Sequence, residues 1–347
     1  MKTYLRRFDV DRAHVAAAYA EWTRSQAGRQ NSWRVAREHG SADALIDEIT
    51  AEIAARELEA RPIAFRDIVD PANGKQRRIG VESVKQQVVD YVAVTALEPL
   101  IAARTGYWQV ASVKGKGGAH VATALRKWTR GRGWFAHIDV RKCYPSIRPD
   151  VVMRLLERRV ASADVLYVCR WLLSTYEGGL SIGSYFSLRM CQLALSEAYH
   201  HLEGLRSTSH GRGRALVAHQ IWYIDDALLF CRTKRELRRA VRELEAALGD
   251  LGLSIKPWKA CRLGSEHAVL AGWRALDGRL GARRAVWRRA RRAMLRARAR
   301  PSSVRRARRA AAYWGWVRPC GRRARSRWAP TARTAGKTIS RAERSPQ

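Results

Sequence analysis

Two adjacent carboxylates are the residues of this sequence best suited to catalysis. Asp225 and Asp226 end the tetrapeptide YIDD at residues 223–226, which has apolar residues on both sides. This pattern predicts the tip of a β-hairpin. Neighbouring carboxylates repel each other, so they need a cation or a shared proton. A hard divalent cation such as Mg²⁺ prefers carboxylate oxygens together with substrate phosphates. A simple Asx turn is the alternative that the tetrapeptide leaves open.

A third carboxylate, Asp139, stands at the end of a predicted strand. In residues 134–139, Ala136 and Ile138 alternate with Phe135 and His137, which is strand periodicity. Asp139 therefore projects from one face of the strand near its end. A carboxylate on one strand that faces a pair on a neighbouring hairpin is the geometry of two-metal phosphoryl transfer. We favour this interpretation over an ordinary strand-end aspartate because the two segments occur together.

These segments resemble the first and third palm motifs of prokaryotic reverse transcriptases of the retron-like and prophage-associated kind. Asp139 matches the aspartate of the first motif, and Asp225 and Asp226 match the aspartates of the YxDD box. The resemblance implies that these three carboxylates, with the backbone carbonyl of Val140, hold two Mg²⁺ ions, for which Mn²⁺ can substitute. It also places Tyr144 at the steric gate, where a ring crowds a 2′-hydroxyl; ordinary packing is the alternative for this residue.

Further segments follow in the order that the family has. Residues 179–187 are similar to the second palm motif, in which Gly183 allows the close backbone approach that a nucleotide needs. Residues 251–259 look like the next palm motif, and Lys259 would contact phosphate or protonate the leaving pyrophosphate, unless it is simply solvated. Residues 270–273 look like the primer-grip turn. The sequence departs from the family at Leu188, Gln192 and Trp222.

Two basic segments upstream resemble parts of the fingers. In residues 74–79, Lys75 and Arg77 would grip the triphosphate, because arginine offers a bidentate fork and lysine a mobile charge. In residues 107–118, Lys114 and Lys116 lie among glycines that allow a loop to approach a nucleic-acid backbone. A charged, solvated loop is the alternative for the first segment.

The formal net charge of +35 indicates a polyanionic partner. Most of the excess follows Arg279, where Glu343 is the only acidic residue. Arg284, Arg288 and Arg291 would follow the phosphates of a template–primer duplex, or form a solvated face of a packed helix, and one helix can do both on different sides.

The six cysteines form no CxxC pair, which argues against zinc and for reduced thiols. There is no signal peptide and no apolar run long enough for a membrane, so we expect a cytoplasmic protein.

The expected fold class is α+β, a right-hand polymerase with fingers, a palm of antiparallel sheet packed on helices, and a helical thumb. The predicted division is a helical segment at 1–61, fingers at 62–134, palm at 135–278, an Arg-rich thumb at 279–329 and a disordered tail at 330–347. Predicted helices begin after Ser41 and Ser83, and a third helix spans residues 234–248 with a buried stripe.

The function implied by this resemblance is RNA-directed DNA polymerisation. Its partners would be dNTPs, an RNA template and the RNA/DNA duplex. The chain is short for an added nuclease domain, so a role in antiphage defence with a cognate noncoding RNA is expected by analogy. A template-independent or self-primed polymerase, and a maturase-like RNA-binding protein, remain the alternatives.

Overall fold

The chain folds into two units, each assembled from three separate stretches of sequence. The computed structural model describes residues 3–6, 8–59, 62–69, 74, 76–209 and 212–344. The first unit takes residues 1–106, 140–201 and 244–255, and the second takes 107–139, 202–243 and 256–347. Residues 107–134, which we assigned to the fingers, thus group with the strands that carry the carboxylates. The division into fingers, palm and thumb remains a prediction.

The first unit is mostly helical, with one antiparallel hairpin. Ser41 caps α4, and Leu45, Ile49 and Ile53 are fully buried, as predicted. Ser83 forms a capping box with Gln86 at the start of α5, which confirms the second predicted helix start. The elements are α1 (Arg12–Arg24), α2 (Gln26–Asn31), α3 (Trp33–His39), α4 (Ala42–Ala55), β1 (Ala64–Val69), β2 (Gln76–Val81), α5 (Val84–Arg104), α7 (Cys143–Ser146), α8 (Pro149–Glu157), α9 (Ala163–Ser174) and α10 (Tyr185–Gly204), whose last turn belongs to the second unit.

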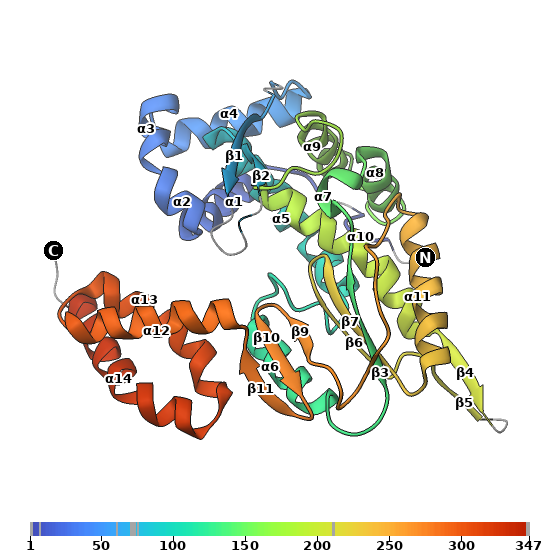
Figure 1. The fold of residues 1–347 in the computed structure, drawn as a ribbon. Coiled ribbons are helices and arrows are strands. Elements are labelled where there is room, and N and C mark those ends of the chain that lie inside the picture. The colour runs from blue at the N-terminus through green and yellow to red at the C-terminus, as the bar shows by residue number, and fades with distance from the viewer. Residues whose placement is uncertain are drawn as a thin grey trace. The chain divides into compact units, whose positions relative to one another are not determined.

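The second unit is built on a four-stranded antiparallel sheet with the order β6-β7-β3-β8. A three-stranded sheet with the order β11-β10-β9 and the hairpin β4-β5 accompany it. Figure 1 shows β6 and β7 beside β3. The strands are β3 (Trp134–Asp139), β4 (Arg206–Ser209), β5 (Arg212–Ala215), β6 (His219–Tyr223), β7 (Asp226–Cys231), β8 (Cys261–Arg262), β9 (Ala268–Leu270), β10 (Trp273–Leu276) and β11 (Arg279–Ala282).

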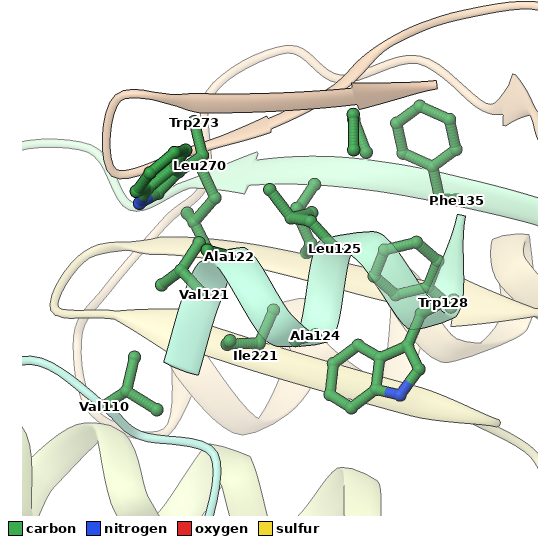
Figure 2. Close-up of a cluster of buried hydrophobic side chains, with 14 of the residues drawn as sticks. Val110, Val121, Ala122, Ala124, Leu125, Trp128, Phe135, Ile221, Leu270 and Trp273 are labelled. Carbon is green, nitrogen blue, oxygen red and sulfur yellow. The ribbon is translucent and has the colours of Figure 1, made fainter. Parts of the chain in front are cut away.

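Helix α6 (Gly118–Trp128) provides the core between these two sheets. Its Val121, Leu125 and Trp128 pack against residues of both sheets in one buried cluster. Figure 2 shows this cluster, in which Trp273 of the second sheet lies near Ala122 and Phe135 of the first sheet lies toward Trp128, at the other end of the helix. Burial of this apolar area is the main force that holds the sheet at a fixed place on α6. The third predicted helix is confirmed as α11 (Lys234–Gly249). The apolar stripe predicted for it is fully buried and consists of Leu237, Val241, Leu244 and Leu248.

The C-terminal part consists of α12 (Arg284–Ala299), α13 (Val304–Val317), the short 3-10 helix η1 (Arg318–Cys320) and α14 (Arg322–Arg344), which lie together in Figure 1. Residues 330–344 are helical, whereas the sequence led us to expect a disordered tail. The reason is packing: Trp328 and Ala335 of α14 are buried in a cluster with Met294 of α12 and Ala310 of α13. Sparse apolar residues suffice here because alanines allow the helices to approach closely. None of the helices in the described ranges combines the length and apolarity needed to cross a bilayer.

Candidate active site

The YIDD segment forms the turn of a β-hairpin, as predicted. Tyr223 is the cross-strand partner of Asp226, so the turn consists of Ile224 and Asp225. Ile224 has a φ of 58°, in the left-handed region that costs a residue other than glycine about 1–2 kcal/mol. A β-branched residue in this conformation persists only where the surrounding strands impose it. The strand pairing therefore fixes Asp225 at the tip of the hairpin.

The register of the central strands places Asp139 directly opposite Asp226. Cross-strand partners project from the same face of a sheet, so these two carboxylates are neighbours. Phe135 and Phe230, four positions further from the carboxylates, pair in the same register, and their ring centroids are 5.9 Å apart. Because both rings are buried in the α6 cluster, a slip of one residue would expose them and move Asp139 to the other face. Core packing thus aligns the carboxylates.

A lysine and a histidine of the same unit contact these carboxylates. The Lys256 ammonium lies 2.6 and 2.7 Å from the two carboxylate oxygens of Asp139, and its backbone N–H donates to the Asp139 carbonyl over 2.9 Å. His137 Nε2 lies 3.3 Å from an Asp226 oxygen. Burial raises the pKa of Asp225, the negative charges of Asp226 and Asp139 raise it further, and Lys256 opposes this. Burial and the two neighbouring carboxylates thus favour the protonated form of Asp225.

The donor chemistry of this cluster fits a hard divalent cation, because three carboxylates share one end of the sheet. As the side chains stand, however, no three His, Cys, Asp or Glu residues of the described ranges converge on a point that could hold a metal ion. At Asp139, both carboxylate oxygens contact the Lys256 ammonium. Val140 belongs to the first unit and pairs with Ile255, so its carbonyl as a ligand remains a prediction.

The first unit joins three of the segments that we expected to contact the nucleotide. The Gly80 N–H of β2 donates to the Ile182 carbonyl over 2.7 Å, and the Leu180 N–H donates to the Tyr144 carbonyl over 3.0 Å. Backbone hydrogen bonds thus connect the strand of Arg77, the helix of Tyr144 and the loop of Gly183. The carboxylates belong to the other unit.

A glycine is needed at position 183 because of how its loop packs, which the sequence did not reveal. Its φ is 119°, and a Cβ atom there would lie 2.6 Å from the Gly80 carbonyl oxygen. Only glycine therefore permits this loop to pack against β2. Contact between Gly183 and a nucleotide remains a prediction.

The sequence also gave no prediction for Asp90 of α5, whose carboxylate is buried. It accepts hydrogen bonds from the Ser184 hydroxyl and from the backbone N–H groups of Tyr185 and Phe186, which begin α10. Burial raises its pKa to about 6, and Glu82, another buried acid, has a pKa well above its usual range because of burial and of Asp90. Asp90 therefore holds the start of α10 next to the Gly183 loop. The available signal was an acidic residue among the valines of an apolar helix.

The remaining predicted contacts are placed as follows. Lys75 lies outside the described residues. Lys259 forms an ion pair with Glu266, which competes with any contact to phosphate. Lys114 is exposed, while Lys116 donates to the Tyr107 carbonyl and lies over the Tyr107 ring. Burial lowers the pKa of Lys116.

Arg284, Arg288 and Arg291 are all exposed on α12. Their spacing of four and three residues puts them on one face of the helix. The opposite face packs Met294 and Ala297 into the C-terminal cluster. The structure therefore permits both interpretations of this helix, a packed face and a free basic face. Its contact with nucleic acid remains a prediction.

Comparison with known proteins identifies the family. The family described as "Reverse transcriptase (RNA-dependent DNA polymerase)" matches residues 68–271, more than half of the chain and including all three carboxylates. The chain therefore belongs to the reverse transcriptase family and has the α+β fold of a right-hand polymerase, as predicted. The retron-like subtype remains a prediction.

A solved structure that the chain resembles is the RNA-dependent RNA polymerase of BmCPV in its elongation state, with a TM-score of 0.47 and 12% identity. The match covers 95% of this chain but only 30% of that polymerase. No protein with a curated description matches the chain.

Proposed function

We propose that this protein is an RNA-directed DNA polymerase. The observation that carries the proposal is the register that sets Asp139 opposite Asp226, with Asp225 held in the adjoining strained turn, in a chain of the reverse transcriptase family. In the proposed reaction, the 3′-hydroxyl of a primer attacks the α-phosphorus of a dNTP. The bond to the leaving pyrophosphate breaks as the new phosphodiester bond forms.

The proposed cofactor is Mg²⁺, with Mn²⁺ as a substitute. Asp139, Asp225 and Asp226, together with the Val140 carbonyl, would hold two ions, which when bound supply positive charge to the attacking and leaving oxygens. Lys256, whose ammonium contacts Asp139, would supply a nearby cation for a phosphate.

The proposed substrate contacts come from the first unit and the basic helix. Arg77 would pair with the triphosphate, and the ring of Tyr144 would exclude a 2′-hydroxyl. Arg284, Arg288 and Arg291 would contact the phosphates of the RNA/DNA duplex. Such binding weakens with salt, because each contacted phosphate releases counterions.

The test is Mg²⁺-dependent incorporation of dNTPs on a primed RNA template by the wild type, Asp225→Asn and the control Asp250→Asn. Asp250 is an exposed carboxylate outside the proposed site. We expect activity in the wild type and control, and a loss of at least about 100-fold in Asp225→Asn. Equal activity in all three proteins would refute the assignment of the site.

The cellular role that we propose is antiphage defence in the cytoplasm with a cognate noncoding RNA as template. Sequencing the RNA and DNA that copurify with the protein tests this role. A DNA product complementary to one host RNA supports it. A product of untemplated sequence would favour template-independent synthesis, and bound RNA with no DNA would favour a maturase-like role.

A further inference from the structure

The second unit contains a large cavity lined by none of the three carboxylates. Its volume is about 1110 Å³, and it lies between α6, the β10–β11 hairpin and the segment from the end of α13 to the start of α14. Sites for single small molecules usually have volumes of about 300–1,000 Å³. The space therefore suits a ligand larger than one nucleotide.

The cavity is strongly basic. Arg126, Arg130, Arg279, Arg318 and Arg325 line it, and no Asp or Glu stands among the described residues of its wall. Two of these arginines have structural contacts, since Arg126 donates to the Pro319 carbonyl over 3.0 Å and Arg130 packs against the turn of the β10–β11 hairpin. Arg279, Arg318 and Arg325 are exposed. Three arginines are thus placed to pair with phosphates, which arginine binds in bidentate fashion.

One wall of the cavity is aromatic. Trp273, Trp314 and Trp316 line it, and the rings of Trp273 and Trp316 stack with centroids 4.7 Å apart and an interplanar angle of 29°. The stack fixes the orientation of Trp316, whose ring is only partly buried. Nucleic-acid bases stack on such rings whatever their sequence.

A buried donor at this wall has no partner. Trp273 is only 2% exposed, and its indole N–H has no hydrogen-bond acceptor in the described part of the chain. Figure 2 shows this nitrogen turned away from Leu125 and Phe135. It faces Gly118, where a Cβ atom would lie 3.4 Å away. Gly118 begins α6, whose cap Gly117 supplies no side-chain acceptor, so this end of the cavity also favours negative charge.

We propose that this cavity binds a segment of single-stranded RNA. Phosphates pair with Arg279, Arg318 and Arg325, and bases stack on Trp314 and Trp316. This inference deepens the proposed function by giving its nucleic-acid partner a second attachment point on the enzyme. A free nucleotide has the same chemistry, but it would leave much of the cavity empty.

The first test measures binding of a labelled single-stranded oligouridylate by fluorescence anisotropy, with a chelator present so that the proposed metal site does not contribute. The variant Arg279→Gln/Arg318→Gln/Arg325→Gln is compared with Arg235→Gln/Arg238→Gln/Arg242→Gln, which removes the same charge from exposed positions of α11. We expect about tenfold weaker binding for the cavity variant and less than about threefold for the control. The slope of log affinity against log salt should fall by about 2 in the cavity variant, at about 0.7 per phosphate contact. Equal losses in the two variants would overturn the proposal.

A second measurement uses the unmodified protein, so it does not depend on the folding of a variant. Ultraviolet cross-linking to the same oligonucleotide, followed by peptide mass spectrometry, should find links to Trp314 or Trp316. Links only elsewhere would contradict a binding site in the cavity. Competition by uridine monophosphate at the affinity of the oligonucleotide would contradict a strand as the ligand. Asp225→Asn should retain this binding, so a failure of polymerase activity and a failure of cavity binding can be told apart.

Discussion

Replacing Asp90 with asparagine should remove a pH dependence of stability that the structure assigns to this buried carboxyl group. Asp90 is fully buried, and its pKa is raised from 3.8 to about 6. The folded state thus binds the proton more tightly than the unfolded chain does. The free energy of unfolding should therefore rise as the pH is lowered through 6 toward 4. A pKa shift of this size changes the free energy of unfolding by about 3 kcal/mol over the whole pH range and by about 1 kcal/mol between pH 7 and pH 5.

The assay is urea unfolding followed by circular dichroism at pH 7, 6 and 5. Asparagine keeps an oxygen that can accept from Ser184, Tyr185 and Phe186, but it cannot ionise. When the pH is lowered from 7 to 5, the free energy of unfolding of the wild type should rise by about 1 kcal/mol more than that of Asp90→Asn. Histidines and other groups that do not contact Asp90 titrate in both proteins and cancel in the difference, whereas the raised pKa of Glu82 should fall in Asp90→Asn, because Asp90 contributes to that rise. Asp250→Asn, at an exposed position, should follow the wild type. If Asp90→Asn kept the dependence of the wild type, the assignment to this carboxyl would be refuted.

Three further predictions concern the Gly183 loop, the carboxylate cluster and the C-terminal helices. Gly183→Ala should lower the free energy of unfolding by about 2 kcal/mol or more, because of its positive φ and its contact with a carbonyl oxygen. Gly178→Ala, also at positive φ but in open space, should cost only about 1 kcal/mol in the same urea titration, and equal costs would contradict the packing argument. Lys256→Met should raise the pKa of Asp225 further, because Lys256 opposes that rise, and an unchanged titration of the Asp225 carboxyl, followed by NMR with a chelator present, would count against the contact. Trp328→Ala should destabilise α14 by about 3–5 kcal/mol, measured as faster proteolysis of the C-terminal helices; unchanged proteolysis would show that this packing is unimportant.

Local sequence signals were sufficient to predict the helix starts and the hairpin turn. Ser41 and Ser83 mark helix starts because a capping side chain acts within three residues of its own position. The YIDD turn was predictable because the strands on both sides of it are apolar. The membership of the reverse transcriptase family was also accessible, since its motifs occur in order along the chain.

Contacts between groups that are distant in sequence depend on how the whole chain packs. The alignment of Asp139 with Asp226 depends on a register fixed by the burial of Phe135 and Phe230, and strand periodicity alone does not specify a partner. The ion pair of Lys256 with Asp139 follows from that same arrangement of the sheet. Local composition likewise predicted disorder for residues 330–344, whereas burial of Trp328 against other helices made them helical. The physical reason is common to all three cases: burial and pairing depend on neighbours far away in sequence, which local propensity and periodicity do not encode.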